Sequence, residues 1–113
     1  MHNERRGLRF AVSAKAELQM EGSRDATPCR VSELSLHGCF MEIAGSFTEN
    51  QTARVTIFQS GTFFEASAKV IYVRPSGVGI LFTDMKPYFR AILQRWILEA
   101  LDQHVGQASE VET

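Results

Sequence analysis

The chain of 113 residues has few of the side chains that build disulfide frameworks or metal centres. Its two cysteines, Cys29 and Cys39, lie on apolar stretches without partners at metal-ligand spacing, so we expect buried free thiols. A disulfide between neighbouring strands is the alternative. No apolar run approaches the ~20 residues that span a bilayer, and no apolar stretch near the start could serve as a signal peptide. We therefore expect a cytoplasmic protein.

The sequence also lacks the motifs that carry catalysis. His2, His37 and His104 are isolated and show no repeated ligand spacing. No nucleophile elbow, phosphate-binding P-loop or zinc-binding H-E-x-x-H is present. This predicts a binding protein without a metal or cofactor rather than an enzyme, with His37 as a solvent-facing loop residue.

Charge of one sign is not in excess, since the formal net charge is -1 at pH 7. Residues 1–30 carry six basic and four acidic side chains, and residues 84–113 carry three basic and five acidic ones. This gradient is too small for a nucleic-acid polymer, which requires a broad basic face. A small anion fits it better.

The hydrophobic pattern predicts one all-β domain. Apolar and polar residues alternate closely from Phe10 to Met20, which is typical of a half-buried strand. In the apolar segment 63–73 we expect Tyr72 to share the core face with Phe64, and the strand to be covered on both faces. Turn signals separate the expected strands, which are residues 10–20, 27–34, 39–43, 54–58, 63–73 and 78–82. Six such strands predict a small antiparallel barrel.

Near the C-terminus the hydrophobic period changes to that of a helix. One helical stripe contains Phe89, Ile92, Leu93, Trp96, Ile97, Ala100 and Leu101. We expect a helix over about residues 85–104, capped by Thr83 or Asp84 and ended by Gly106, with a disordered tail at 107–113. The stripe should cover one end or face of the barrel, or pair with another subunit.

Three arginines, Arg5, Arg6 and Arg9, lie within five positions near the start. Arg5 and Arg9 share one side of the chain in either an extended or a helical segment. A guanidinium binds phosphate oxygens two at a time and also binds the O6/N7 edge of guanine. We expect residues 1–10 to form a flexible cationic arm that binds an anion. The alternative is an exposed arm whose arginines are only solvated.

A second polar group is formed by Glu33, Ser35 and Gly38. Glu33 and Ser35 would point to the same side of an extended segment. Gly38 would then provide a tight turn or a close backbone approach. The alternative is a plain loop in which Ser35 bonds to its own backbone.

In this order and spacing, Arg5-x-x-x-Arg9 and Glu33-x-Ser35-x-x-Gly38 resemble the R-x-x-x-R and [D/N]-x-S-x-x-G motifs of the PilZ-domain family. The run Gly77-Val78-Gly79-Ile80-Leu81-Phe82 resembles the family's G-x-G-x-x-F closing strand. The resemblance implies a six-stranded antiparallel split barrel with one C-terminal helix, spanning residues 7–106 after the arm. Glu33 stands where the family has Asp or Asn, and its extra methylene moves the carboxylate outward by roughly 1 Å.

Many members of this family are bacterial receptors for cyclic di-GMP, and the resemblance implies the same ligand here. Arg5 and Arg9 would then clamp phosphates and guanine edges, while Glu33 would accept from a guanine N–H. The implied ligand-binding residues are Arg5, Arg6, Arg9, Glu33, Ser35, Gly38 and Gly79. Ligand binding would order the arm, and the signal would pass by contact with another protein. A PilZ-like adaptor that does not bind cyclic di-GMP is the alternative that Glu33 favours.

Overall fold

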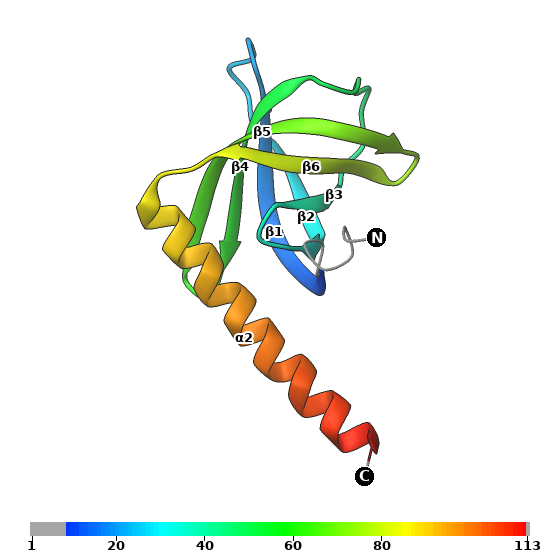
Figure 1. The fold of residues 1–113 in the computed structure, drawn as a ribbon. Helices are drawn as coiled ribbons and strands as arrows, with labels where there is room; N and C mark the ends of the chain where they lie inside the picture. Colours follow the sequence, from blue (N-terminus) through cyan, green and yellow to red (C-terminus); the bar gives the residue numbers. More distant parts are fainter. Residues whose placement is uncertain (1–8, 113) are drawn as a thin grey trace.

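The computed structural model describes the backbone of residues 9–112 and the side chains of residues 9–102. Six strands are followed by one helix (Figure 1). The elements are β1 (Phe10–Met20), β2 (Thr27–Leu34), β3 (Gly38–Glu42), β4 (Thr52–Gln59), β5 (Thr62–Arg74), β6 (Gly77–Asp84) and α2 (Pro87–Glu112).

The strands form a closed antiparallel barrel in the order β1-β2-β3-β6-β5-β4. This confirms the predicted six-stranded barrel, and the strand ends lie close to their predicted positions. Alternate residues point into the barrel because successive side chains of a strand face opposite sides. The fully buried core includes Leu18, Val31, Met41, Val55, Ile57, Phe64, Val70, Val78 and Ile80.

A β-bulge in β5 changes the face on which Tyr72 lies. Val70 pairs with Ile80 and Tyr72 pairs with Gly79, so Ile71 is an extra residue on β5. A one-residue shift moves every following side chain to the other face of a strand. Tyr72 is therefore on the outer face, and its predicted position on the core face is wrong.

Strand β5 is also less covered than the sequence predicts. Ile71, the bulged residue, and Val73, which follows Tyr72 near the end of the strand, are both exposed. Phe63 is partly exposed too, although its ring lies 5.5 Å from that of Phe89 on α2. The expected cover on both faces of β5 is therefore missing at Phe63, Ile71 and Val73.

Helix α2 begins and ends later than predicted. Its first turn is anchored at Lys86, whose carbonyl accepts hydrogen bonds from the backbone N–H groups of Phe89 and Arg90. Thr83 and Asp84, the predicted caps, belong to β6 instead. The helix also continues through Gly106 to Glu112. A glycine costs a helix roughly 1 kcal/mol relative to alanine, which does not by itself end it.

The first half of α2 covers one end of the barrel, as predicted. Ile92, Leu93 and Trp96 are buried, and the rings of Trp96 and Phe64 lie 6.3 Å apart. The second half extends away from the barrel (Figure 1). Leu101, a member of the predicted stripe, is therefore 37% exposed. Within residues 9–112, no helix has both the length and the hydropathy needed to cross a bilayer.

Both cysteines are free thiols, as predicted, with Cys39 buried and Cys29 half-buried. Burial raises the pKa of Cys29 from its ordinary value of 9.0 to about 11, and the negative charge of Glu17 makes a smaller contribution in the same direction. Burial, together with the neighbouring Cys29, raises the pKa of Cys39 as well. Because the thiolate is the reactive form, both thiols should react slowly.

A thiol-specific reagent tests this arrangement at pH 8. We expect native Cys29 to react at least roughly a hundredfold more slowly than a free cysteine, because a pKa near 11 lowers the thiolate fraction by about that factor. Cys39 should react only after unfolding. In a Cys29→Ser variant, labelling should therefore require denaturant, and rapid native labelling of that variant would contradict the burial of Cys39.

Candidate functional site

Five residues form a row across the outer face of the barrel. Successive pairing partners on β1, β2, β3, β6 and β5 are Ala11, Glu33, Phe40, Gly79 and Tyr72. The row depends on three register irregularities, between Ala11 and Ala14, between Val31 and Glu33, and between Val70 and Tyr72. Residues from five strands thus share one surface.

Gly79 lies in the middle of this row and allows two aromatic rings to meet over it. A Cβ atom at Gly79 would lie 2.3 Å from two atoms of the Tyr72 ring. The Tyr72 ring instead lies flat over the glycine and stacks on Phe40, with centroids 6.2 Å apart and planes at 20°. The Arg74 guanidinium lies 4.7 Å from the Tyr72 centroid and 5.9 Å from that of Phe40. The result is an aromatic surface with a cation lying over it.

Ser35 fixes the turn between β2 and β3. Its Oγ accepts hydrogen bonds from the backbone N–H groups of His37 (3.1 Å) and Gly38 (3.2 Å) and donates to the Gly38 carbonyl (3.2 Å). One donor and two acceptor positions are all that a hydroxyl has. Ser35 is buried in the turn and does not extend β2 beside Glu33, so the alternative of a backbone-bonded serine is the one observed.

Gly38 allows the turn to pack closely against β6. A Cβ atom there would lie 2.0 Å from the backbone oxygen of Ile80. Next to this contact, the backbone N–H of Phe82 donates to the His37 carbonyl at 2.8 Å. His37 itself is exposed, as predicted. The turn is therefore held by its own serine and by β6.

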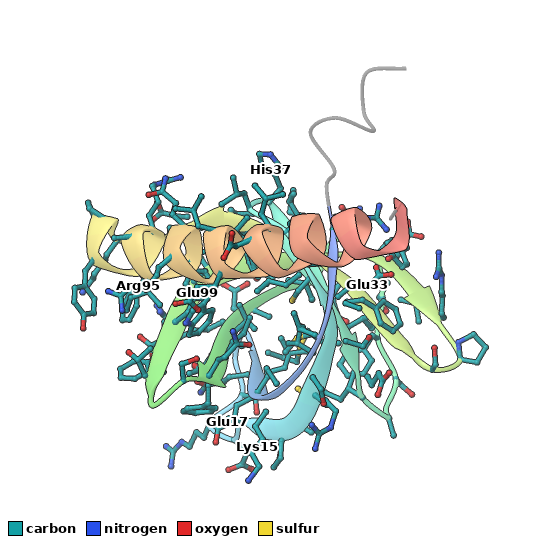
Figure 2. The ribbon with its side chains drawn as sticks, turned by 90° about the horizontal axis from the view of Figure 1, so that it is seen from below. Lys15, Glu17, Glu33, His37, Arg95 and Glu99 are labelled. Carbon is teal, nitrogen blue, oxygen red and sulfur yellow. The ribbon has the colours of Figure 1, made fainter. Side chains whose placement is uncertain are left out.

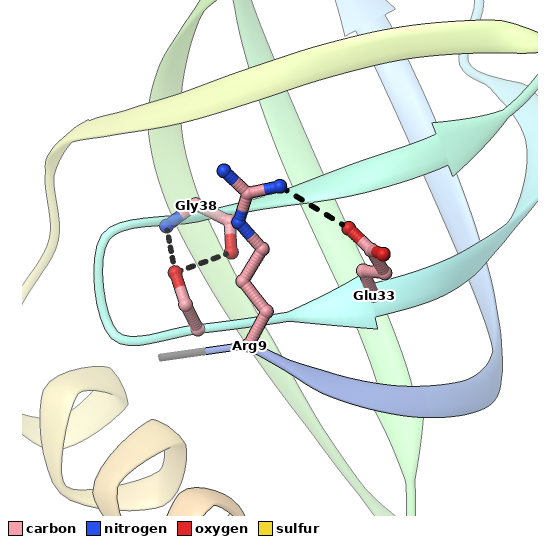
Figure 3. A network of polar contacts seen from close by, with 4 residues as sticks. Arg9, Glu33 and Gly38 are labelled. Atoms are coloured by element: carbon pink, nitrogen blue, oxygen red, sulfur yellow. Dashed lines mark hydrogen bonds and ion pairs between the residues drawn. The ribbon is translucent and has the colours of Figure 1, made fainter. Parts of the chain in front are cut away.

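Arg9 and Glu33 face each other across this turn. Nη1 of Arg9 lies 3.5 Å from Oε1 of Glu33, and the side chains are 58% and 48% exposed. Figure 3 shows Arg9 rising from the start of β1 across the β2–β3 hairpin, with the Ser35–Gly38 hydrogen bonds beside it. A surface ion pair of this kind stabilises by at most about 1 kcal/mol, so a stronger anion can redirect the guanidinium.

These groups line a single pocket of about 140 Å³. It includes five predicted site residues, which are Arg9, Glu33, Ser35, Gly38 and Gly79. The other two, Arg5 and Arg6, lie outside the described residues. The remaining lining residues are Leu34, His37, Cys39, Phe40, Ile71, Tyr72, Ile80 and Leu81.

The aromatic part of the site was not predicted from the sequence. Phe40 carries a usable signal, because it alternates with Cys39 and Met41 and so had to face outward. Tyr72 has no such signal, since its outward position depends on the bulge at Ile71. Arg74 follows Tyr72 onto the outer face.

The pocket suits one planar, partly polar group better than a whole nucleotide. Its volume is below the ~300–1,000 Å³ of typical small-molecule sites. Its walls combine an aromatic surface with a carboxylate and a guanidinium, which can stack a base, accept from its N–H groups and bind a phosphate. Among the described residues, no group of three or more His, Cys, Asp or Glu side chains could hold a metal ion.

Solved structures with the same fold include several PilZ domains. The PilZ domain of YcgR from Escherichia coli with cyclic di-GMP is 14% identical, with a TM-score of 0.70, and the match covers 90% of this chain and 95% of that one. The PilZ domain of CeSA from a cellulose-synthesizing bacterium is 10% identical, with a TM-score of 0.69 and coverage of 82% and 97%. YcgR of E. coli in complex with cyclic di-GMP is 19% identical, with a TM-score of 0.72 and coverage of 92% and 49%.

Sequence comparison leads to the same family. No curated protein matches the chain. The family model described as the PilZ domain matches residues 3–99, which include both polar motifs, the six strands and the covered half of the helix. With this match and the shared barrel, the resemblance of the sequence motifs is confirmed, and the chain belongs to the PilZ domain family.

Proposed function

We propose that this protein is a receptor for cyclic di-GMP. The observation that carries the proposal is that one pocket brings together Arg9, Glu33, Ser35, Gly38 and Gly79, which come from separate parts of the sequence. The E. coli YcgR structures with cyclic di-GMP support the same ligand class. We infer a binding protein without a cofactor, not an enzyme.

In the proposed complex, one guanine lies against the surface formed by Phe40, Tyr72 and the Arg74 guanidinium that lies over their rings. Glu33 accepts hydrogen bonds from the guanine N–H groups, and Arg9 leaves Glu33 to bind a phosphate or the guanine O6/N7 edge. Arg5 and Arg6 supply further positive charge for the two phosphates. Ser35 acts on the shape of the turn, because its hydroxyl already has three partners.

We further propose that the ligand acts by changing the surface that another protein contacts. A dianionic ligand offsets the entropy cost of ordering the arginine arm over the pocket. The exposed side chains of Leu36, Ile71 and Leu81 lie at or beside the same pocket. Ligand, arm and apolar rim would then form one composite surface, acting in the cytoplasm.

Calorimetric titration with cyclic di-GMP tests the proposed function. We expect saturable binding, with GMP as a control that presents the same base but one phosphate. Absence of heat at high micromolar cyclic di-GMP, with the protein folded by circular dichroism, would overturn the proposal.

The second candidate function is an adaptor that does not bind the nucleotide, which the longer side chain of Glu33 and its ion pair with Arg9 favour. A Glu33→Asp variant separates the two functions. If the natural protein gives no heat and Glu33→Asp binds cyclic di-GMP, the adaptor is supported. If both bind with similar affinity, Glu33 is tolerated and the receptor is supported.

Removing the cation over the aromatic surface should weaken binding moderately. We expect Arg74→Ala to lower the affinity for cyclic di-GMP roughly threefold to tenfold, because Tyr72 loses a cation–π contact and the site loses one positive charge. The matched control is Arg54→Ala, which removes an exposed arginine of β4 that does not line this pocket. Equal affinities of the two variants would show that Arg74 has no part in the site.

A further inference from the structure

Basic and acidic residues are separated along α2, with the basic ones near its start and the acidic ones towards its end. From Lys86 to Arg95 the sequence has three basic residues and no acidic one, and from Trp96 to Glu112 it has four acidic residues and no basic one. The first turn has no acidic residue and the last turn no basic one. This order opposes the helix dipole, which favours acidic residues at the N-terminus and basic residues at the C-terminus. This order of charges is complementary to a neighbouring surface on which acidic groups face the start of α2 and basic groups face its end.

The face of α2 that points away from the barrel carries an exposed apolar side chain. Leu98 is 64% exposed, and Tyr88, on the flank of the helix, is 68% exposed. Leu98 follows the buried Trp96 by two residues, a rotation of about 200°, and so lies on the opposite side of the helix. Seen from below in Figure 2, α2 lies across the near side of the barrel with this face uncovered.

The charged residues next to Leu98 have no ion-pair partner within the described part of the chain. The one ion pair found among residues 9–102 is that of Arg9 and Glu33. Arg95 and Asp102 are both exposed and lie on the same side of Leu98 at helical spacing. Glu99 is exposed beside them (Figure 2).

We propose that α2 is the contact surface of a symmetric dimer, in which the helices of two copies pack antiparallel with Leu98 near the two-fold axis. A second copy in this orientation presents the same charges in reverse order, so that Arg95 of each copy lies beside Asp102 of the other. A parallel pair would instead place like charges together. Two-fold dimers with self-complementary surfaces are the commonest closed assemblies, and complementary charge fixes register and orientation.

This dimer does not depend on the proposed nucleotide binding. The pocket is lined by Arg9 and by residues of β2, β3, β5, β6 and the β2–β3 turn, and α2 contributes none of them. Failure of either proposal therefore leaves the other untouched, because calorimetry tests the pocket and sedimentation tests the helix.

Sedimentation equilibrium of the full chain tests the contact. We expect a dimer between about 1 and 500 µM protein that weakens as salt is raised. Leu98→Glu should weaken it roughly tenfold or more. Val73→Glu, which changes an equally apolar exposed residue on β5, should leave it unchanged. A monomer at every concentration overturns the proposal and would leave the helix free for a different protein. A dimer that Leu98→Glu does not weaken overturns it as well.

Charge reversal tests the antiparallel arrangement. Arg95→Glu and Asp102→Arg should each weaken the dimer, and the two changes in one chain should restore it, because the exchanged charges again face each other. A dimer that each single change weakens and the double change does not restore contradicts the pairing.

Cross-linking locates the two-fold axis. In a Cys29→Ser background, Leu98→Cys should form a disulfide with its copy. Ala91→Cys should not, because the two positions would be about 21 Å apart along the helices at 1.5 Å rise per residue. Efficient cross-linking through both positions would indicate a parallel pair and overturn the proposal.

Discussion

Replacing Gly38 by alanine should lower the free energy of unfolding by about 3 kcal/mol or more. The added Cβ would lie 2.0 Å from the backbone oxygen of Ile80. Backbone cannot move aside as a flexible side chain can, so the β2–β3 turn would have to separate from β6. The separation would strain the hydrogen bond between Phe82 and His37 and the three bonds of Ser35.

Chemical denaturation followed by circular dichroism measures this loss. Gly22→Ala is the matched control, because a Cβ there meets nothing within 4 Å. At Gly22 the only cost is the left-handed backbone, with φ of +87°, which is about 1–2 kcal/mol. If Gly38→Ala were no more destabilising than Gly22→Ala, the close approach of turn and β6 would be wrong. Should Gly38→Ala fail to fold at all, the soluble yields of the two variants give the same comparison.

Arg9→Ala should weaken cyclic di-GMP binding by roughly tenfold to a hundredfold. Among the residues that the structure describes, Arg9 provides the guanidinium that lines the pocket. A charge-assisted hydrogen bond from it to phosphate or guanine is among the stronger polar contacts. Its loss also leaves Glu33 unpaired near a dianion, and the repulsion adds to the effect. Stability should hardly change, because the ion pair with Glu33 is exposed.

Titration calorimetry on three variants isolates the guanidinium. Arg9→Lys keeps the charge but loses the planar fork, and should lie between the natural protein and Arg9→Ala. Arg24→Ala removes an exposed arginine of the loop between β1 and β2 and should bind normally. If Arg9→Ala binds as tightly as Arg24→Ala, Arg9 does not contact the ligand.

Most of the barrel could be predicted because its strands show the simple alternation that burial of one face requires. Phe10 to Met20 is the clearest case, since every second residue enters the core or its border. The spacing of Arg9, Glu33, Ser35 and Gly38 likewise identified residues that the structure brings into one pocket. Local sequence was sufficient where a feature depends only on period or motif.

The errors arise where a feature depends on residues far away in the sequence. Tyr72 faces outward because of a bulge relative to β6, and no local pattern shows which strand residue has no partner. The path of the chain around Ser35 similarly depends on the fit of Gly38 against Ile80. The late end of α2 shows the converse, because Gly106 is a local stop signal that is too weak to end a long helix.

Closure of the barrel limits how a downstream protein can recognise this one. Each of the six strands has a hydrogen-bonded neighbour on both sides. Backbone paired on one side only remains in short segments, such as β1 before Lys15 and β5 after Val70, so a peptide could add as a further strand only at such short segments. Elsewhere on the barrel, recognition relies on side chains, either around the proposed nucleotide pocket or along the helix. Binding of a partner protein at the pocket or along the helix should consequently be disrupted by single side-chain substitutions.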